Sequence, residues 1–193
     1  MKKNTLAIIA ILGVLIIWGF GIYNKMISKD ENVKSVWAKV ETQYQRRGDL
    51  IGNLVNTVKG YADFEQETLT KVIEARSKAT GVTIDPSNIS PAQLQQFQEA
   101  QGQLSGALSR LLLTVERYPD LKANQNFLEL QAQLEGTENR IAVARDNFND
   151  AARDFNTYTK KVPKNIIANI GGFDEKPYFE AEEGNEKVPV VEF

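Results

Sequence analysis

The chain has 193 residues, of which 42% are hydrophobic and 25% are charged, and its net charge is −2. It contains neither Cys nor His, which excludes disulfides, thiol nucleophiles, Ser-His-Asp triads and the usual zinc and haem ligands. We therefore expect no cofactor, no bound metal and no catalytic residues. Residues 4–173 carry 19 basic and 18 acidic side chains, a balance that predicts no nucleic-acid partner.

The first element is an apolar segment at residues 5–24, which contains no charged side chain. A helix needs about 20 apolar residues to span a bilayer, so this segment predicts a transmembrane anchor and makes the lipid bilayer a partner. Trp18 and Tyr23 lie toward one end, where aromatic rings favour the membrane interface. A cleaved signal peptide is the alternative, but the apolar stretch is too long for one and no small-x-small site follows it.

The lysines on either side of the span bear on its orientation. Two precede it and four follow it closely, namely Lys2, Lys3, Lys25, Lys29, Lys34 and Lys39. Cytoplasmic flanks carry the excess of positive charge, so this count favours a cytoplasmic bulk of the chain, although large domains can cross regardless of such charges.

Three long helices are expected after the anchor. Apolar residues recur at helical spacing over residues 31–79, then over 91–118 and 124–161. A loop separates the first two, and Ser90, Pro91 and Gln93 form a capping-box start for the second helix. Pro119 and Pro163 end the second and third helices. The pattern predicts an all-α protein in which an N-terminal transmembrane helix precedes an antiparallel bundle of three to four long helices.

The end of the chain reads as a short amphipathic helix, NIIANIGGF, followed by an acidic tail. Residues 174–193 hold seven acidic side chains against Lys176 and Lys187, which predicts a flexible, solvated tail; an added strand from VPVVEF is the alternative. The predicted organisation is an anchor at 1–24, a helical bundle at 25–173 and the tail at 174–193.

Three strings, RRGDLIGNLVNTVKGYA, LLLTVERYPDLKANQNFLELQAQLEGTENRIAVARDNFNDAARDFN and GGF, resemble the LemA family of bacterial membrane proteins. The resemblance covers nearly the whole chain. It implies a single-pass protein of the bacterial plasma membrane, an amino terminus outside the cell, a soluble antiparallel helical bundle and no enzyme activity. Where the family commonly reads DLIPNLV and GYAxHE, this chain has Gly52 and Phe64.

The stretch RRGDLIG, residues 46–52, raises the question of a site, a hinge or plain bundle. Adhesion through Arg47-Gly48-Asp49 is disfavoured because the tripeptide lies within a helical pattern. If helix one continues to residue 79, a rise of about 1.5 Å per residue makes it longer than helix two. Helix two then ends some 30 Å farther from the membrane than residue 31. RRGDLIG and ERYPD therefore meet at the membrane-facing end, or foot, of the bundle. Helical spacing turns Arg47 inward, and an ionic clasp with Glu116 or Asp120 is expected there. Solvated charges at Arg46 and Arg47 are the alternative.

Below that foot, an apolar stripe on residues 31–47 would have no cover from its own bundle. Its members are Val33, Val36, Trp37, Val40 and Tyr44. The stripe predicts a stalk that pairs with a second copy, giving a homo-oligomer, or with another membrane protein. The alternative is that residues 31–47 fold back as a fourth bundle helix.

These features favour a non-enzymatic, membrane-anchored interaction or scaffold protein, with no small-molecule substrate. The interaction residues are those of the stripe together with Arg46, Arg47, Asp49, Glu116 and Asp120. One alternative is a lipid-binding or membrane-remodelling protein that uses the lysines beside NIIANI. The other is an enzyme with Arg and carboxylate groups at residues 46–49 and 116–120.

Overall fold

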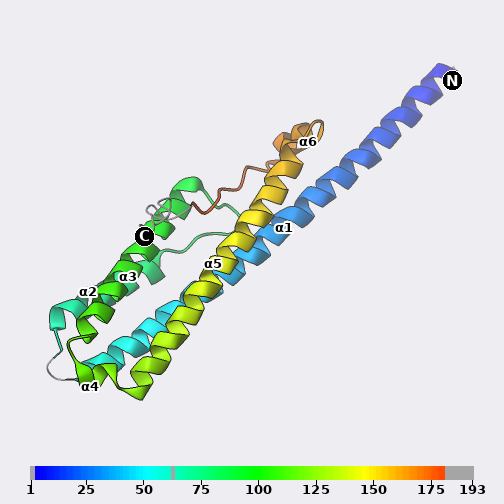
Figure 1. Ribbon diagram of the computed structural model, residues 1–193. Helices are drawn as coiled ribbons and strands as arrows, with labels where there is room; N and C mark the ends of the chain where they lie inside the picture. Colours follow the sequence, from blue (N-terminus) through cyan, green and yellow to red (C-terminus); the bar gives the residue numbers. More distant parts are fainter. Residues whose placement is uncertain (1–2, 62–63, 181–193) are drawn as a thin grey trace, which may run out of the picture.

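The computed structural model describes residues 3–61 and 64–180. This part of the chain is all-α, without strands, and forms six helices (Figure 1). They are α1 (Lys3–Lys59), α2 (Gln66–Gly81), α3 (Pro91–Val115), α4 (Pro119–Lys122), α5 (Gln125–Lys160) and α6 (Lys164–Gly171). The predicted fold class, an N-terminal apolar helix followed by an antiparallel bundle, is confirmed.

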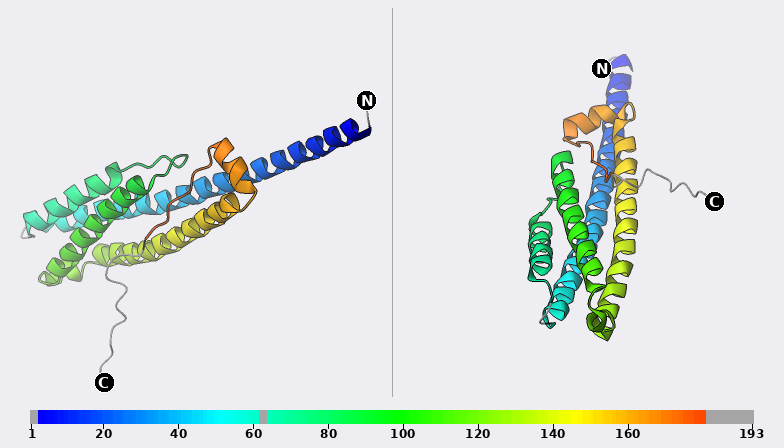
Figure 2. Two further views of the ribbon diagram at one scale, coloured as in Figure 1. Left: turned by 90° about the horizontal axis from the view of Figure 1, so that it is seen from above. Right: turned by 60° about the vertical axis from the view of Figure 1, so that its left-hand side comes forward.

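Helix α1 is one uninterrupted helix of 57 residues that extends beyond the bundle at its N-terminal end (Figures 1 and 2). The large apolar side chains of residues 8–20 are exposed, and among the described residues this is the one helix long and apolar enough to cross a membrane. From Ile22 onward the same helix contributes to buried clusters. Anchor and bundle therefore share one helix, with no linker between them.

The chain reverses direction after α1, between Lys59 and Gln66. Turn hydrogen bonds run from the Gly60 N–H to the Thr57 carbonyl and from the Tyr61 N–H to the Val58 carbonyl. The prediction of one helix over residues 31–79 is therefore wrong. Apolar spacing continues across the turn, since Val58 and Leu69 enter the same core cluster from α1 and α2. Periodicity alone thus did not reveal the break.

The other helix ends lie close to the predicted ones, except that α3 ends at Val115 and Pro119 begins the short helix α4. Ser90 and Gln93 form the predicted capping box of α3, and the Asn124 side chain accepts a hydrogen bond from the Phe127 N–H to cap α5. Helix α6 ends at Gly171 and is capped by Gly172, whose φ of 69° is a left-handed conformation that suits glycine.

The long helices run alternately up and down. Figure 1 shows α5 crossing in front of α1, and the right-hand view of Figure 2 shows α2 and α3 on one side of α1 and α5 on the other. Helix α5 has 36 residues, a length of about 54 Å. It starts at the end farthest from the anchor and returns along α1 as far as Lys29, which forms an ion pair with Asp154. Helix α5 therefore covers α1 from the far end of the bundle back to Lys29.

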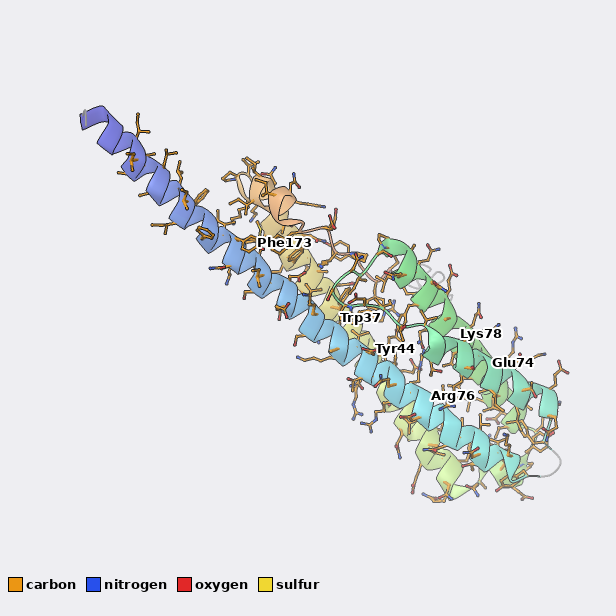
Figure 3. All side chains as sticks on the ribbon, turned by 180° about the vertical axis from the view of Figure 1, so that it is seen from behind. Trp37, Tyr44, Glu74, Arg76, Lys78 and Phe173 are labelled. Carbon is orange, nitrogen blue, oxygen red and sulfur yellow. The ribbon has the colours of Figure 1, made fainter. Side chains whose placement is uncertain are left out.

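This length corrects the prediction of an uncovered stripe. Val33, Trp37, Val40 and Tyr44 are buried and Val36 is partly buried, in a cluster with Phe97 of α3 and with Phe148 and Phe155 of α5. Figure 3 shows Trp37 and Tyr44 along the middle of α1. Residues 31–47 neither form a free stalk nor fold back as a separate helix; they are the central part of α1. The stripe thus gives no reason for a partner.

The expectation of a solvated tail fails for residues 174–180. This segment runs back over the bundle, and Lys176 and Phe179 are buried. The Phe179 ring stacks on Trp37 at a centroid distance of 5.9 Å and contacts Phe148 at 5.4 Å. The remaining tail, and with it the alternative of a VPVVEF strand, lies outside the described residues.

Candidate functional site

The stretch RRGDLIG lies in the C-terminal part of α1, where α2 packs closely against it. A Cβ atom at Gly48 would lie 3.2 Å from the Thr80 methyl group, and one at Gly52 would lie 3.2 Å from the Arg76 guanidinium carbon. Arg76 Nε also donates a hydrogen bond of 2.6 Å to the Gly48 carbonyl. The two glycines therefore allow close helix packing, and α1 does not bend into a hinge there.

Arg47 lies at the centre of a buried polar cluster. Its side chain is 3% exposed, and its guanidinium donates to the Glu138 carboxylate at 3.0 Å and to Ser105 Oγ at 3.2 Å. It also donates to the Gln101 side chain and lies 5.0 Å from the centre of the Tyr44 ring. Gln101 in turn donates to the Ala79 carbonyl at 3.1 Å. The cluster joins α1, α2, α3 and α5.

Arg47 is thus turned inward, as its helical position predicts, but the expected partners are wrong. Glu116 pairs with Lys122, and the Arg47 carboxylate partner is Glu138 of α5. The error follows from the misplaced turn, because ERYPD packs beside Phe64 and Glu65 at the far end of the bundle. There Tyr118 contacts Phe64 at a ring distance of 5.0 Å, and Arg117 pairs with Glu65 at 2.8 Å.

The other charged residues proposed for the site lie at the surface. Arg46, Asp49 and Asp120 are exposed, and Asp49 lies 4.0 Å from the Arg76 guanidinium. Residues 46–49 and 116–120 are therefore not brought together as one polar site, which removes the geometric basis for an enzyme at that place.

A second polar cluster lies at the membrane-proximal end of the bundle. The Asp30 carboxylate forms ion pairs with Lys176 Nζ at 2.7 Å and with Lys34 Nζ at 2.8 Å. Burial raises the pKa of the Asp30 carboxyl, but the hydrogen bonds from Lys176 and Lys34 outweigh it, so the pKa lies below its ordinary value of 3.8. The pKa of Lys34 is raised by its hydrogen bonds to Asp30 and Glu31. This cluster fixes residues 174–176 against α1.

Two asparagines of α5 hold the segment after α6 in place. Asn156 donates to the Lys176 carbonyl and accepts from its N–H, both at 2.8 Å. Asn149, two turns earlier, accepts from the Phe179 N–H at 2.8 Å and donates to its carbonyl at 3.1 Å. Sequence analysis missed both residues. The sequence did carry a signal for them, because the two amide side chains are seven positions apart and lie beside the predicted apolar face of that helix.

Helix α6 lies against α1 at the junction of anchor and bundle. Ala168 packs with Ile22 and Met26, and the Tyr23 ring contacts Phe173 at 5.4 Å. A cavity of about 240 Å³ lies beside this contact, between α1, the loop before α3 and residues 171–176. The described residues contain no group of three or more acidic side chains suited to a metal ion. Helix α6 and Phe173 thus pack the end of the bundle against the base of the anchor.

Comparison with known proteins supports this description. The LemA family model matches residues 36–193. Magnetosome protein MamQ 2 of Paramagnetospirillum magneticum is 26% identical over 199 residues, covering 93% of this chain and 71% of its own length. Protein LemA of Metamycoplasma hominis is 25% identical over 157 residues, covering 81% and 68%. With its family-specific strings and its anchored helical bundle, the chain belongs to the LemA family.

Proposed function

We propose that this protein is a non-enzymatic interaction or scaffold module that holds a rigid helical bundle at the surface of a bacterial plasma membrane. Its partners are further copies of the chain or other proteins of the same membrane, and the bulk of the chain faces the cytoplasm.

One observation carries the proposal: the same helix forms the anchor and the spine of the bundle. Helix α1 passes from exposed apolar residues into the buried clusters without a break. A catalytic domain does not require this rigid coupling to its anchor, whereas a scaffold depends on fixed distance and orientation. The absence of Cys and His from the sequence also favours a non-catalytic role.

The partner surface is not the apolar stripe, because α3 and α5 cover it. The surfaces left for a protein partner are the anchor, whose side chains at residues 8–20 are exposed, and the outer faces of α3 and α5, which expose Leu113 and Val143. Contacts through the anchor would place copies side by side in the bilayer.

The test is site-specific photocrosslinking of the full chain in its native membrane. A photoreactive residue at Ile9 or Ile16 samples the anchor, and one at Leu113 or Val143 samples the bundle. The proposal predicts a discrete adduct with a second copy or with a membrane protein, identified by mass spectrometry. Adducts with lipid alone at all four positions would contradict it.

The enzyme alternative has its own test. The purified full chain is screened against hydrolase substrates beside the variants Arg47→Met and Glu138→Gln. Turnover that survives purification and disappears in either variant would replace the scaffold proposal.

A further inference from the structure

We propose that α6 is an interfacial membrane helix, whose exposed isoleucines enter the headgroup region of the same bilayer that α1 spans. The occupant of this exposed face is therefore lipid. The inference does not depend on the identity, or the existence, of a protein partner.

The first observation is position. The described apolar surface of α1 runs through Phe20 and Tyr23, and its first charge after the span is Lys25. Helix α6 packs on α1 at that level, because Ala168 contacts Ile22 and Met26. A Cβ atom added to Gly171 would lie 3.0 Å from the Tyr23 ring. The exposed apolar surface of the anchor thus continues directly onto α6.

The second observation is direction. Both views of Figure 2 show α6 lying across the line of α1 rather than along it. If α1 crosses the bilayer near its normal, α6 lies close to the membrane plane. Helices that bind the interface adopt this orientation, with the apolar face entering the boundary between headgroups and acyl chains.

The third observation is the exposed face itself. Ile166 and Ile170, one helical turn apart, are 57% and 84% exposed, and Val162 just before α6 is exposed as well. Ala168 occupies the opposite side and is buried. Helix α6 therefore has apolar residues on two sides: Ala168 and the partly buried Ile167 pack on the protein, whereas Ile166 and Ile170 face away from it. Contact with lipid removes these side chains from water.

Charge beside α6 is nearly balanced, so the apolar residues provide the main attraction. Lys160 pairs with Glu175, and Lys164 Nζ lies 3.8 Å from the centre of the Tyr158 ring. Lys161, before α6, and Asp174, after it, are both exposed. We therefore expect docking to zwitterionic lipid as well as to anionic lipid.

The experiment uses the full chain reconstituted in vesicles, with one cysteine introduced and labelled by an environment-sensitive fluorophore. Ile166→Cys and Ile170→Cys probe α6. Leu113→Cys is the matched control, because Leu113 is 72% exposed on α3, near the end of the bundle farthest from the anchor. The chain has no native Cys to interfere. All three positions are exposed, so the substitutions are expected to leave folding intact, which circular dichroism checks.

Vesicles of pure phosphatidylcholine, with and without bromine on the acyl chains, give the readout. The proposal predicts blue-shifted emission and strong quenching by brominated lipid at positions 166 and 170, and neither effect at 113. Emission at 166 and 170 that matches position 113 would overturn it. A blue shift without quenching would also overturn it, because the cover would then be protein. A second set of vesicles contains phosphatidylglycerol, and quenching at positions 166 and 170 in that set alone would reject apolar docking.

Discussion

At the scale of single residues, buried charge determines which helices meet. Arg47 is nearly inaccessible to water, and a guanidinium there requires acceptors from the surrounding helices. Gln101, Ser105 and Glu138 supply them, while Tyr44 covers the guanidinium face. The cluster therefore fixes the register of α1 against α3 and α5 through polar contacts, in addition to apolar packing.

Glu138→Gln tests this role. The substitution keeps the shape of the side chain but leaves the buried Arg47 without its carboxylate, so we expect a loss of about 1 to 2 kcal/mol, less than for a fully desolvated pair because Glu138 is partly exposed. Chemical denaturation of the full chain in detergent measures the change. Glu135→Gln, at an exposed position of the same helix, is the control and is expected to have little effect.

Asp30 gives a prediction for pH dependence. Its folded-state pKa lies below its ordinary value, so its contribution to stability is complete above about pH 3.8 and is lost as the pH falls through the folded-state pKa. Asp30→Asn removes the contribution at neutral pH and leaves Lys176 buried without its partner, which we expect to cost about 1 to 3 kcal/mol.

The measurement is Tm as a function of pH for both proteins. Wild type and Asp30→Asn are expected to differ at pH 7 and to converge in acid. Asp150→Asn removes an exposed pair with Arg153 and serves as the control, with little change at either pH. A constant difference between wild type and Asp30→Asn down to the lowest pH would show that the carboxylate charge is not the cause.

At the scale of elements, glycine positions distinguish packed from open helix faces. A Cβ added to Gly48 would lie 3.2 Å from the Thr80 methyl group of α2, whereas a Cβ added to Gly102 of α3 would meet nothing within 4 Å. Both residues lie within helices, where glycine is unfavourable. The same substitution is therefore expected to act in opposite directions at the two sites.

Gly102→Leu is expected to stabilise the protein by roughly 0.5 to 1 kcal/mol through helix propensity. Gly48→Leu is expected to destabilise it by about 1 to 3 kcal/mol, because the side chain forces α2 away from α1. Tm values of the two variants provide the comparison. Equal gains at both positions would mean that α2 does not pack closely on Gly48.

At the scale of the whole molecule, the anchor and the bundle overlap in sequence. The anchor was expected to end at residue 24, yet Ile22 and Met26 both lie in the cluster beneath α6. The same turns of α1 thus form the membrane boundary and the base of the bundle. A truncation within these turns therefore affects both the anchor and the packing of the bundle.

Two truncations test the overlap. Removing residues 1–20 deletes the exposed apolar segment and keeps Ile22, Tyr23 and Met26, whereas removing residues 1–28 also takes away the support of α6. Both products are expected to be strongly helical by circular dichroism, because the larger clusters remain. The longer truncation is expected to have a lower Tm and faster amide exchange at residues 164–171. Equal exchange in the two products would contradict the proposed support.

The sequence by itself determined the apolar anchor, the helical class, the cap of α3 and the faces that are buried. These features depend on local chemistry: uninterrupted apolar length, helical spacing and capping side chains. Leu108 and Phe148, which lie on the helically spaced apolar faces of the predicted second and third helices, are both buried.

The tertiary structure decided which elements cover those faces. The turn after Lys59, the pairing of Arg47 with Glu138, the burial of Phe179 and the position of α6 beside Ile22 all depend on contacts between distant parts of the chain. Apolar burial is non-directional, so periodicity reports that a face is covered without identifying its cover. For the stripe on α1, that cover is α3, α5 and the segment after α6, because α5 is long enough to return to the base of the anchor.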